Sequence, residues 1–223
     1  MRPPGDIPNR HYGEPVIELP SLPSHPGATR AQHVLARLVR PAIVNHSIRT
    51  YVWAVLAGER RGMAPGTDYD DDLLFYACSL HDLGTSDAYD GPLRFEVDGA
   101  DAAAELLTAE GLDAARVDQV WEAIALHTSP HIAERRGPIT LLTRLGVLTD
   151  FGQETIDDPA VREEVERLHP RMDIERELTD AVVAQAVRRP EKAPLHSWPG
   201  GLLRAHLDAA VSHTAAQPER TEA

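Results

Sequence analysis

The chain has 223 residues, of which 42% are hydrophobic and 26% are charged, values that are ordinary for a globular protein with one well-packed core. Its net charge of −13 argues against nucleic acid as a partner, because a polyanionic backbone would be repelled. A single cysteine excludes an intrachain disulfide, and the absence of an apolar signal or membrane-spanning run leads us to expect a cytoplasmic protein without a membrane partner.

Two tails are expected to flank one domain. Residues 1–28 contain seven prolines without a helical period, which predicts an extended N-terminal arm that lies on the body or on a partner. Residues 214–223 are polar and predict a flexible C-terminal tail. Residues 29–213 contain no repeat, low-complexity segment or shift in composition, so we expect a single domain there. The tails and short helices leave room for a homodimer.

Helical periods begin in the first part of this domain. Pro41 suits the first turn of a helix on which His46 and Trp53 share one face. Alternatively, a longer helix over 29–40 ends at this proline and the next helix begins there. A further helix is expected over 70–83, because its first residues are acidic and favour the positive end of the helix dipole. Gly84 is well placed to end that helix.

The remainder of the domain also has helical periods. Each predicted helix begins at an aspartate that can cap the first turn, at a proline that fits it, or at a glycine. We find no alternating strand pattern, so the predicted fold is all-α. The expected helix starts are Asp98, Asp113, Pro138, the pair Asp158-Pro159, Asp173 and Gly201.

Four residues form the candidate metal site: His46, His81, Asp82 and Asp150. A single histidine on an apolar helical face is more often a hydrogen-bonded core residue than a ligand. The combination is more informative, because Asp150 lies on an apolar helix where an unpaired carboxylate would be costly. His81 and Asp82 can reach one ion only near a helix end. Two imidazoles and two carboxylates suit one divalent metal, Zn²⁺ first, with Fe²⁺ and Mn²⁺ as alternatives.

The order His46, then His81-Asp82, then Asp150 resembles the pattern of the HD-domain metalloproteins over roughly residues 30–190. This resemblance implies an HD-domain-like helical bundle. Finer similarity points to the cyanamide-hydratase-type branch, whose members are implied to bind zinc or iron and to add water to cyanamide, giving urea. Phosphohydrolases of the family often have a lysine where this chain has Thr85. The stretches that carry the finer similarity are His46–Tyr51, His81–Thr85, Arg94–Ala100 and Ala125–Thr128.

The chemistry expected of such a site starts from water. A bound Zn²⁺ can lower the pKa of coordinated water to about 7 and so provide hydroxide to attack an electrophilic carbon. Asp82 is the predicted ligand and orienter of this water. His127 is our first choice for the proton donor, because histidine titrates near neutral pH. Thr128 is expected to bind substrate and His131 to assist, although Pro130 interrupts any helix between these histidines.

Three functions remain open from the sequence. The first is a metal-dependent hydratase for cyanamide or a related nitrile-like compound, with a small neutral pocket. The second is an HD phosphohydrolase for a nucleotide or phosphate ester, in which Arg49, Arg94 or Arg144 would point at the metal. The third is a non-enzymatic, metal-stabilised binding module. The predicted substrate-binding residues are Arg49, Tyr51, Phe95, Glu96 and His131.

Overall fold

The computed structural model describes residues 17–155 and 158–215, which form nine α-helices and four short 3₁₀ helices and contain no β-strand. The all-α prediction is therefore confirmed. The parts of the expected arm and tail at 1–16 and 216–223 lie outside the described residues. The α-helices are α1 (Pro26–Leu38), α2 (Pro41–Arg60), α3 (Asp71–Leu80), α4 (Phe95–Ala109), α5 (Ala114–Leu126), α6 (Pro138–Asp150), α7 (Pro159–Leu168), α8 (Ile174–Arg188) and α9 (Trp198–Ala215).

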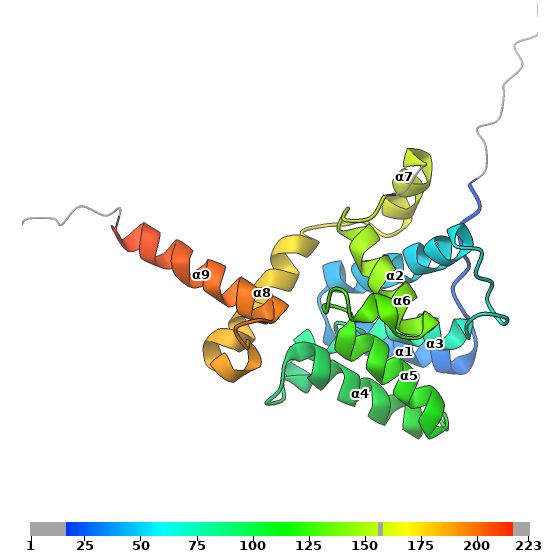
Figure 1. Cartoon of the computed structure of the whole chain (residues 1–223), viewed down its shortest axis with the longest axis horizontal. Helices are drawn as coiled ribbons and strands as arrows, with labels where there is room; N and C mark the ends of the chain where they lie inside the picture. The colour runs from blue at the N-terminus through cyan, green and yellow to red at the C-terminus, as the bar shows by residue number, and fades with distance from the viewer. Residues whose placement is uncertain (1–16, 156–157, 216–223) are drawn as a thin grey trace, which may run out of the picture.

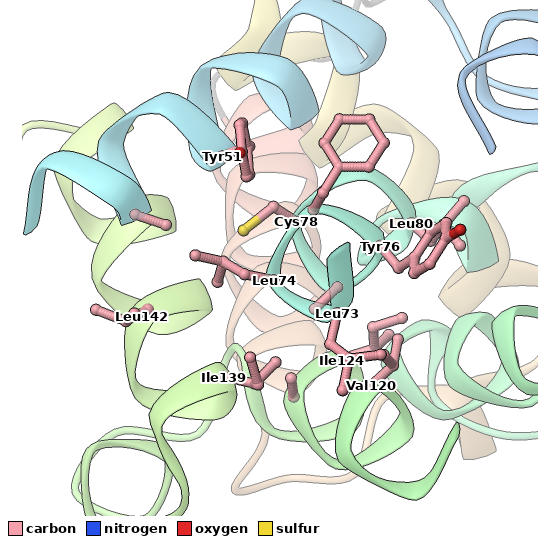
Figure 2. Packing of buried hydrophobic residues seen from close by; sticks show 14 of the residues in the cluster. Tyr51, Leu73, Leu74, Tyr76, Cys78, Leu80, Val120, Ile124, Ile139 and Leu142 are labelled. Carbon is pink, nitrogen blue, oxygen red and sulfur yellow. The ribbon is translucent and has the colours of Figure 1, made fainter. Parts of the chain in front are cut away.

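Helices α1 to α6 form the body of the molecule, and α8 and α9 lie to one side of it, with α9 running outward (Figure 1). No described helix combines the length and apolarity needed to cross a bilayer. The largest apolar cluster joins the buried faces of α2, α3, α5 and α6 (Figure 2). A smaller cluster packs Ile174, Leu178 and Val182 of α8 against Ile43 and Phe95. This second cluster fixes α8 beside the ends of α2 and α4.

Several helix starts follow the sequence prediction. Asp113 and Asp158 accept hydrogen bonds from backbone N–H groups in the first turns of α5 and α7. Pro41 and Pro138 occupy the first positions of α2 and α6. Both interpretations of the chain before Pro41 apply in part, because a separate helix, α1, precedes it. These positions depend only on neighbouring residues, which explains why the sequence predicts them well.

The start of α4 differs from its prediction. The helix begins at Phe95 with Arg94 as the preceding residue, so Asp98 lies in the first turn and is not the N-cap. The Asp98 carboxylate instead accepts hydrogen bonds from the backbone N–H of Leu93 and from Lys192 Nζ, the latter at 2.6 Å. Lys192 is buried and also contacts Asp90 at 2.9 Å. This distant partner, which local sequence does not reveal, ties the segment before α9 to α4.

Two other boundaries also shift. Helix α3 ends at Leu80, before the expected end, and Gly84 lies in a 3₁₀ turn (η1, Leu83–Thr85). A Cβ on Gly84 would lie 2.0 Å from the carbonyl oxygen of Phe95, so this glycine permits the turn to pack against α4. Helix α9 begins at Trp198, before the predicted Gly201, because the Ser197 hydroxyl accepts from the Gly200 N–H.

Helices α2 and α6 pack most closely at Gly146. A Cβ there would lie 2.3 Å from the carbonyl oxygen of Thr50 and 3.1 Å from the Cβ of Ala54. The absence of a side chain therefore lets the two helices approach. This contact matters for the site, because α2 carries His46 and α6 carries Asp150.

We predict that Gly146→Ala lowers the free energy of unfolding by about 2 kcal/mol or more, since the added methyl group forces α2 and α6 apart. Gly201→Ala in α9 is the matched control: nothing lies within 4 Å of its Cβ position, and alanine is favoured over glycine in a helix by about 1 kcal/mol. Urea unfolding followed by circular dichroism measures both. Equal stability of the two variants would contradict the close approach.

Candidate metal centre

Two helix ends and one helix interior bring Asp82 and the three histidines of the site together. His46 lies within α2, whereas His81 and Asp82 immediately follow the last residue of α3. His127 follows α5 in the same way. All four side chains are buried. Because α3 ends at Leu80, neighbouring residues His81 and Asp82 can face one point, as the sequence argument required.

The distances among the first three residues suit one metal ion. His46 Nε2 lies 3.1 Å from His81 Nε2 and 3.6 Å from Asp82 Oδ2. His81 Nε2 lies 3.3 Å from the same carboxylate oxygen. Ligand atoms at about 2.1 Å from a tetrahedral metal are roughly 3.4 Å apart. These three residues therefore form a cluster that can hold a divalent cation.

Hydrogen bonds at the opposite ring edges orient the imidazoles. His81 Nδ1 lies 2.8 Å from the carbonyl oxygen of Cys78, and His127 Nδ1 lies 2.7 Å from that of Ile124. His46 Nδ1 lies 2.7 Å from Asp150 Oδ2. Each carbonyl or carboxylate requires a hydrogen on Nδ1, which leaves the Nε2 lone pair of the neutral ring for another partner.

The charge distribution also fits a cation. Asp82 Oδ2 is buried and accepts no hydrogen bond within the described part of the chain. Burial alone would raise the pKa of Asp82, but His81, His46 and His127 lower it below its usual value. Burial likewise opposes protonation of His81, yet Asp82 raises its pKa. The carboxylate therefore attracts positive charge, which a metal ion would supply.

Asp150 is placed differently from the sequence expectation. Its Oδ1 accepts hydrogen bonds from Arg49 Nε at 2.7 Å and Trp53 Nε1 at 3.0 Å, and its Oδ2 accepts from Arg49 at 2.8 Å. It contacts His46 at Nδ1, whereas Nε2 faces the metal cluster. The two ring nitrogens point to opposite sides, so Asp150 orients His46 here and does not join the ligand cluster.

A cavity of about 720 Å³ opens from the metal cluster toward α8 and α9. Its lining includes His127 and Thr128, the arginines Arg94 and Arg144, and Trp198. Other lining residues had no recognisable signal in the sequence, because separate elements bring them together: Ser129, Gln153, Glu175, Thr179 and His196.

The other predicted substrate-binding residues do not line this cavity. The Tyr51 hydroxyl donates to Asp71, and the Arg49 guanidinium is bound to Asp150, so both are structural contacts. Phe95 lies behind His127, with ring centroids 5.7 Å apart. Glu96 is fully buried and binds Thr128. His131 is exposed at a positive φ of 67°, beyond the break at Pro130.

His127, which we expected to be the proton donor, lies in surroundings that favour its neutral ring. Burial and the neighbouring His81 lower its pKa to about 3. Its Nδ1 hydrogen is directed to the Ile124 carbonyl, and its Nε2 lies 3.8 Å from Asp82 Oδ1. At neutral pH the ring is therefore an acceptor next to the cluster.

We predict that His81→Ala and Asp82→Ala each abolish metal binding and activity, because each removes a ligand from the buried cluster. Cys78→Ala is the control: the thiol is buried in the neighbouring core (Figure 2), where burial raises its pKa to about 12 and its partner is Thr143. Only the backbone carbonyl of Cys78 contacts His81, and the substitution keeps it. Elemental analysis of the purified proteins measures the metal. Retained metal and full turnover in Asp82→Ala would exclude this site.

We predict that Asp150→Asn weakens metal binding by about 10- to 100-fold without eliminating it, since it removes the charged acceptor that orients His46. Competition with a chelator of known affinity measures the change. Asp173→Asn is the control, because its ion pair with Arg176 is exposed and Asp173 does not line the cavity. Complete metal loss in Asp150→Asn, as in Asp82→Ala, would instead identify Asp150 as a ligand.

Comparison with protein families supports the interpretation of the site. The family model of the HD domain matches residues 43–180, a range that contains His46, His81, Asp82 and Asp150. A comparison with curated proteins found no match. HD domains are all-α, bind divalent metals and are generally metal-dependent hydrolases. With this match over most of its length and a His-Asp cluster suited to a metal, the chain belongs to the HD domain family.

Proposed function

We propose that this chain is a metal-dependent hydratase that adds water to cyanamide or a related small nitrile-like compound. The observation that carries this choice is the pairing of the cavity's arginines. Arg94 binds Glu96 at 3.2 Å, and Arg144 binds Glu134 at 3.3 Å and the carbonyl oxygen of His127 at 2.9 Å. Their positive charges are thus offset within the protein, which suits an uncharged substrate better than a phosphate dianion.

His46, His81 and Asp82 would hold the metal, and Asp150 would orient His46. A divalent metal at this position makes water acidic enough to supply a nucleophile at neutral pH. The residues on the cavity side, His127 and Thr128, would then position the electrophilic carbon. Addition of one water to H₂N–C≡N gives urea: the oxygen bonds to carbon, and both hydrogens of the water end on nitrogen. The added water therefore provides the protons, and His127 need not act as an acid.

An HD phosphohydrolase is the second candidate, and the cavity volume favours it. About 720 Å³ is within the range of sites for drug-sized ligands, whereas cyanamide has three non-hydrogen atoms. Arg94 and Arg144 could exchange their protein partners for a phosphate. The third hypothesis, a metal-stabilised binding module, receives less support, because the cluster lies at the floor of an open cavity.

We predict that the purified protein forms urea from cyanamide, that a chelator abolishes this activity and that Zn²⁺ or Fe²⁺ restores it. The assay compares wild-type protein with His81→Ala, and a parallel panel of nucleotides and phosphate esters is followed by phosphate release. Metal-dependent phosphate release without urea would replace the proposal by the second candidate. Bound metal with neither product would favour the binding module.

A further inference from the structure

Glu96 is a buried acid that the proposed hydration does not yet use. It is fully buried in the first turn of α4 and does not line the cavity. Its Oε1 accepts a hydrogen bond from the Thr128 hydroxyl at 2.5 Å and one from the Arg94 guanidinium at 3.2 Å. Burial raises the pKa of Glu96, whereas Arg94 and the Thr128 hydroxyl, which both donate to this oxygen, oppose that shift.

This contact determines how Thr128 can bind a substrate. A hydroxyl has a single hydrogen and two acceptor lone pairs. Since the hydrogen of Thr128 is directed to Glu96, its oxygen can only accept hydrogen bonds from a molecule in the cavity. Thr128 and the adjacent His127 both line the cavity into which the metal cluster opens.

We propose that Glu96 holds Thr128 as an acceptor for a substrate N–H group, so that the site selects an electrophile with an adjacent amino group. This inference rests on the proposed hydratase function and assigns its specificity. Thr128 contacts the substrate, whereas Glu96 and Arg94 are positioning residues. Cyanamide carries such an amino group next to its nitrile carbon. An N,N-dialkylated cyanamide has the same reactive carbon but lacks the donor.

The chemistry also bears on the competing substrate class. The oxygens of a phosphate dianion are acceptors only, so they cannot pair with the lone pairs of Thr128. A partly buried acceptor that remains unpaired costs binding free energy. The Thr128–Glu96 pair therefore favours an amino-bearing substrate over a phosphate at this position.

Substitutions at Thr128 test the proposal in turnover. Thr128→Val keeps the shape of the side chain but removes the acceptor, whereas Thr128→Ser retains it. Wild-type protein is expected to prefer cyanamide over dimethylcyanamide in kcat/KM. We expect Thr128→Val to reduce this preference about tenfold, mainly by raising KM for cyanamide, and Thr128→Ser to keep it. Metal content is measured in each variant to show that the cluster is intact.

Glu96→Leu tests the positioning role, and Glu96→Gln is its matched control, because an amide oxygen can still accept from both Thr128 and Arg94. Leucine removes this acceptor, so the hydroxyl hydrogen of Thr128 can turn toward the cavity. The preference for cyanamide should persist in Glu96→Gln, whereas it should fall in Glu96→Leu as in Thr128→Val. A purely structural role of Glu96 would lower stability or metal content without changing the ratio between the two substrates.

Binding to metal-free protein provides a readout that does not depend on turnover. Urea has four N–H hydrogens and should bind about tenfold more weakly to Thr128→Val than to wild-type protein. Tetramethylurea has none and should bind to both proteins with the same affinity. Ligand-observed NMR titration measures the affinities. An unchanged urea affinity and an unchanged substrate preference in Thr128→Val would overturn the proposal. Failure of wild-type protein to convert either cyanamide would overturn the hydratase function alone, and the binding comparison would still decide the role of Thr128.

Discussion

The carboxylate of Asp150 connects the two helices on which the metal cluster depends. It accepts hydrogen bonds from Arg49, Trp53 and His46, all of which lie on α2, while Asp150 is the last residue of α6. The Arg49 contact is bidentate and fully buried, so charge and geometry are both satisfied without solvent. Burial alone would raise the pKa of Asp150, yet Arg49 and His46 lower it well below its usual range.

This network explains why the two acids of the site differ in role. Asp150 is neutralised by Arg49, and Arg171 adds a second guanidinium at 3.6 Å. The Asp82 carboxylate instead lies beside the imidazoles of His46 and His81, and one of its oxygens accepts no hydrogen bond from the described residues. Of these two buried carboxylates, Asp82 is therefore the one that lacks an arginine partner, and it lies beside the Nε2 atoms of the histidines. A cation would be stabilised most beside Asp82. The hydrogen bond from His46 Nδ1 to Asp150 orients the ring so that its Nε2 faces that position.

Local signals made much of this arrangement predictable. Pro41, Asp113 and Pro138 act on the first turn of their own helices, and His46 and Asp82 reach the cluster because helical periodicity and the end of α3 direct them there. The sequence could not reveal which edge of the His46 ring Asp150 contacts, since that depends on how closely α2 and α6 approach. It also could not predict the start of α4, because the carboxylate of Asp98 is bound by the distant Lys192.

The same long-range contacts shape the cavity. Lys192 anchors the segment before α9 to Asp98 in the first turn of α4, and that turn also carries Glu96. The first turn of α4 therefore fixes both the segment before Trp198, which forms part of the cavity wall, and the polar contact to Thr128. Phe95 links them further, since its ring lies 5.9 Å from that of Trp198 and 5.7 Å from that of His127. The first turn of α4 therefore contacts both the cavity wall at Trp198 and the residues beside the metal cluster, so the packing of this one turn determines how the two are placed relative to each other.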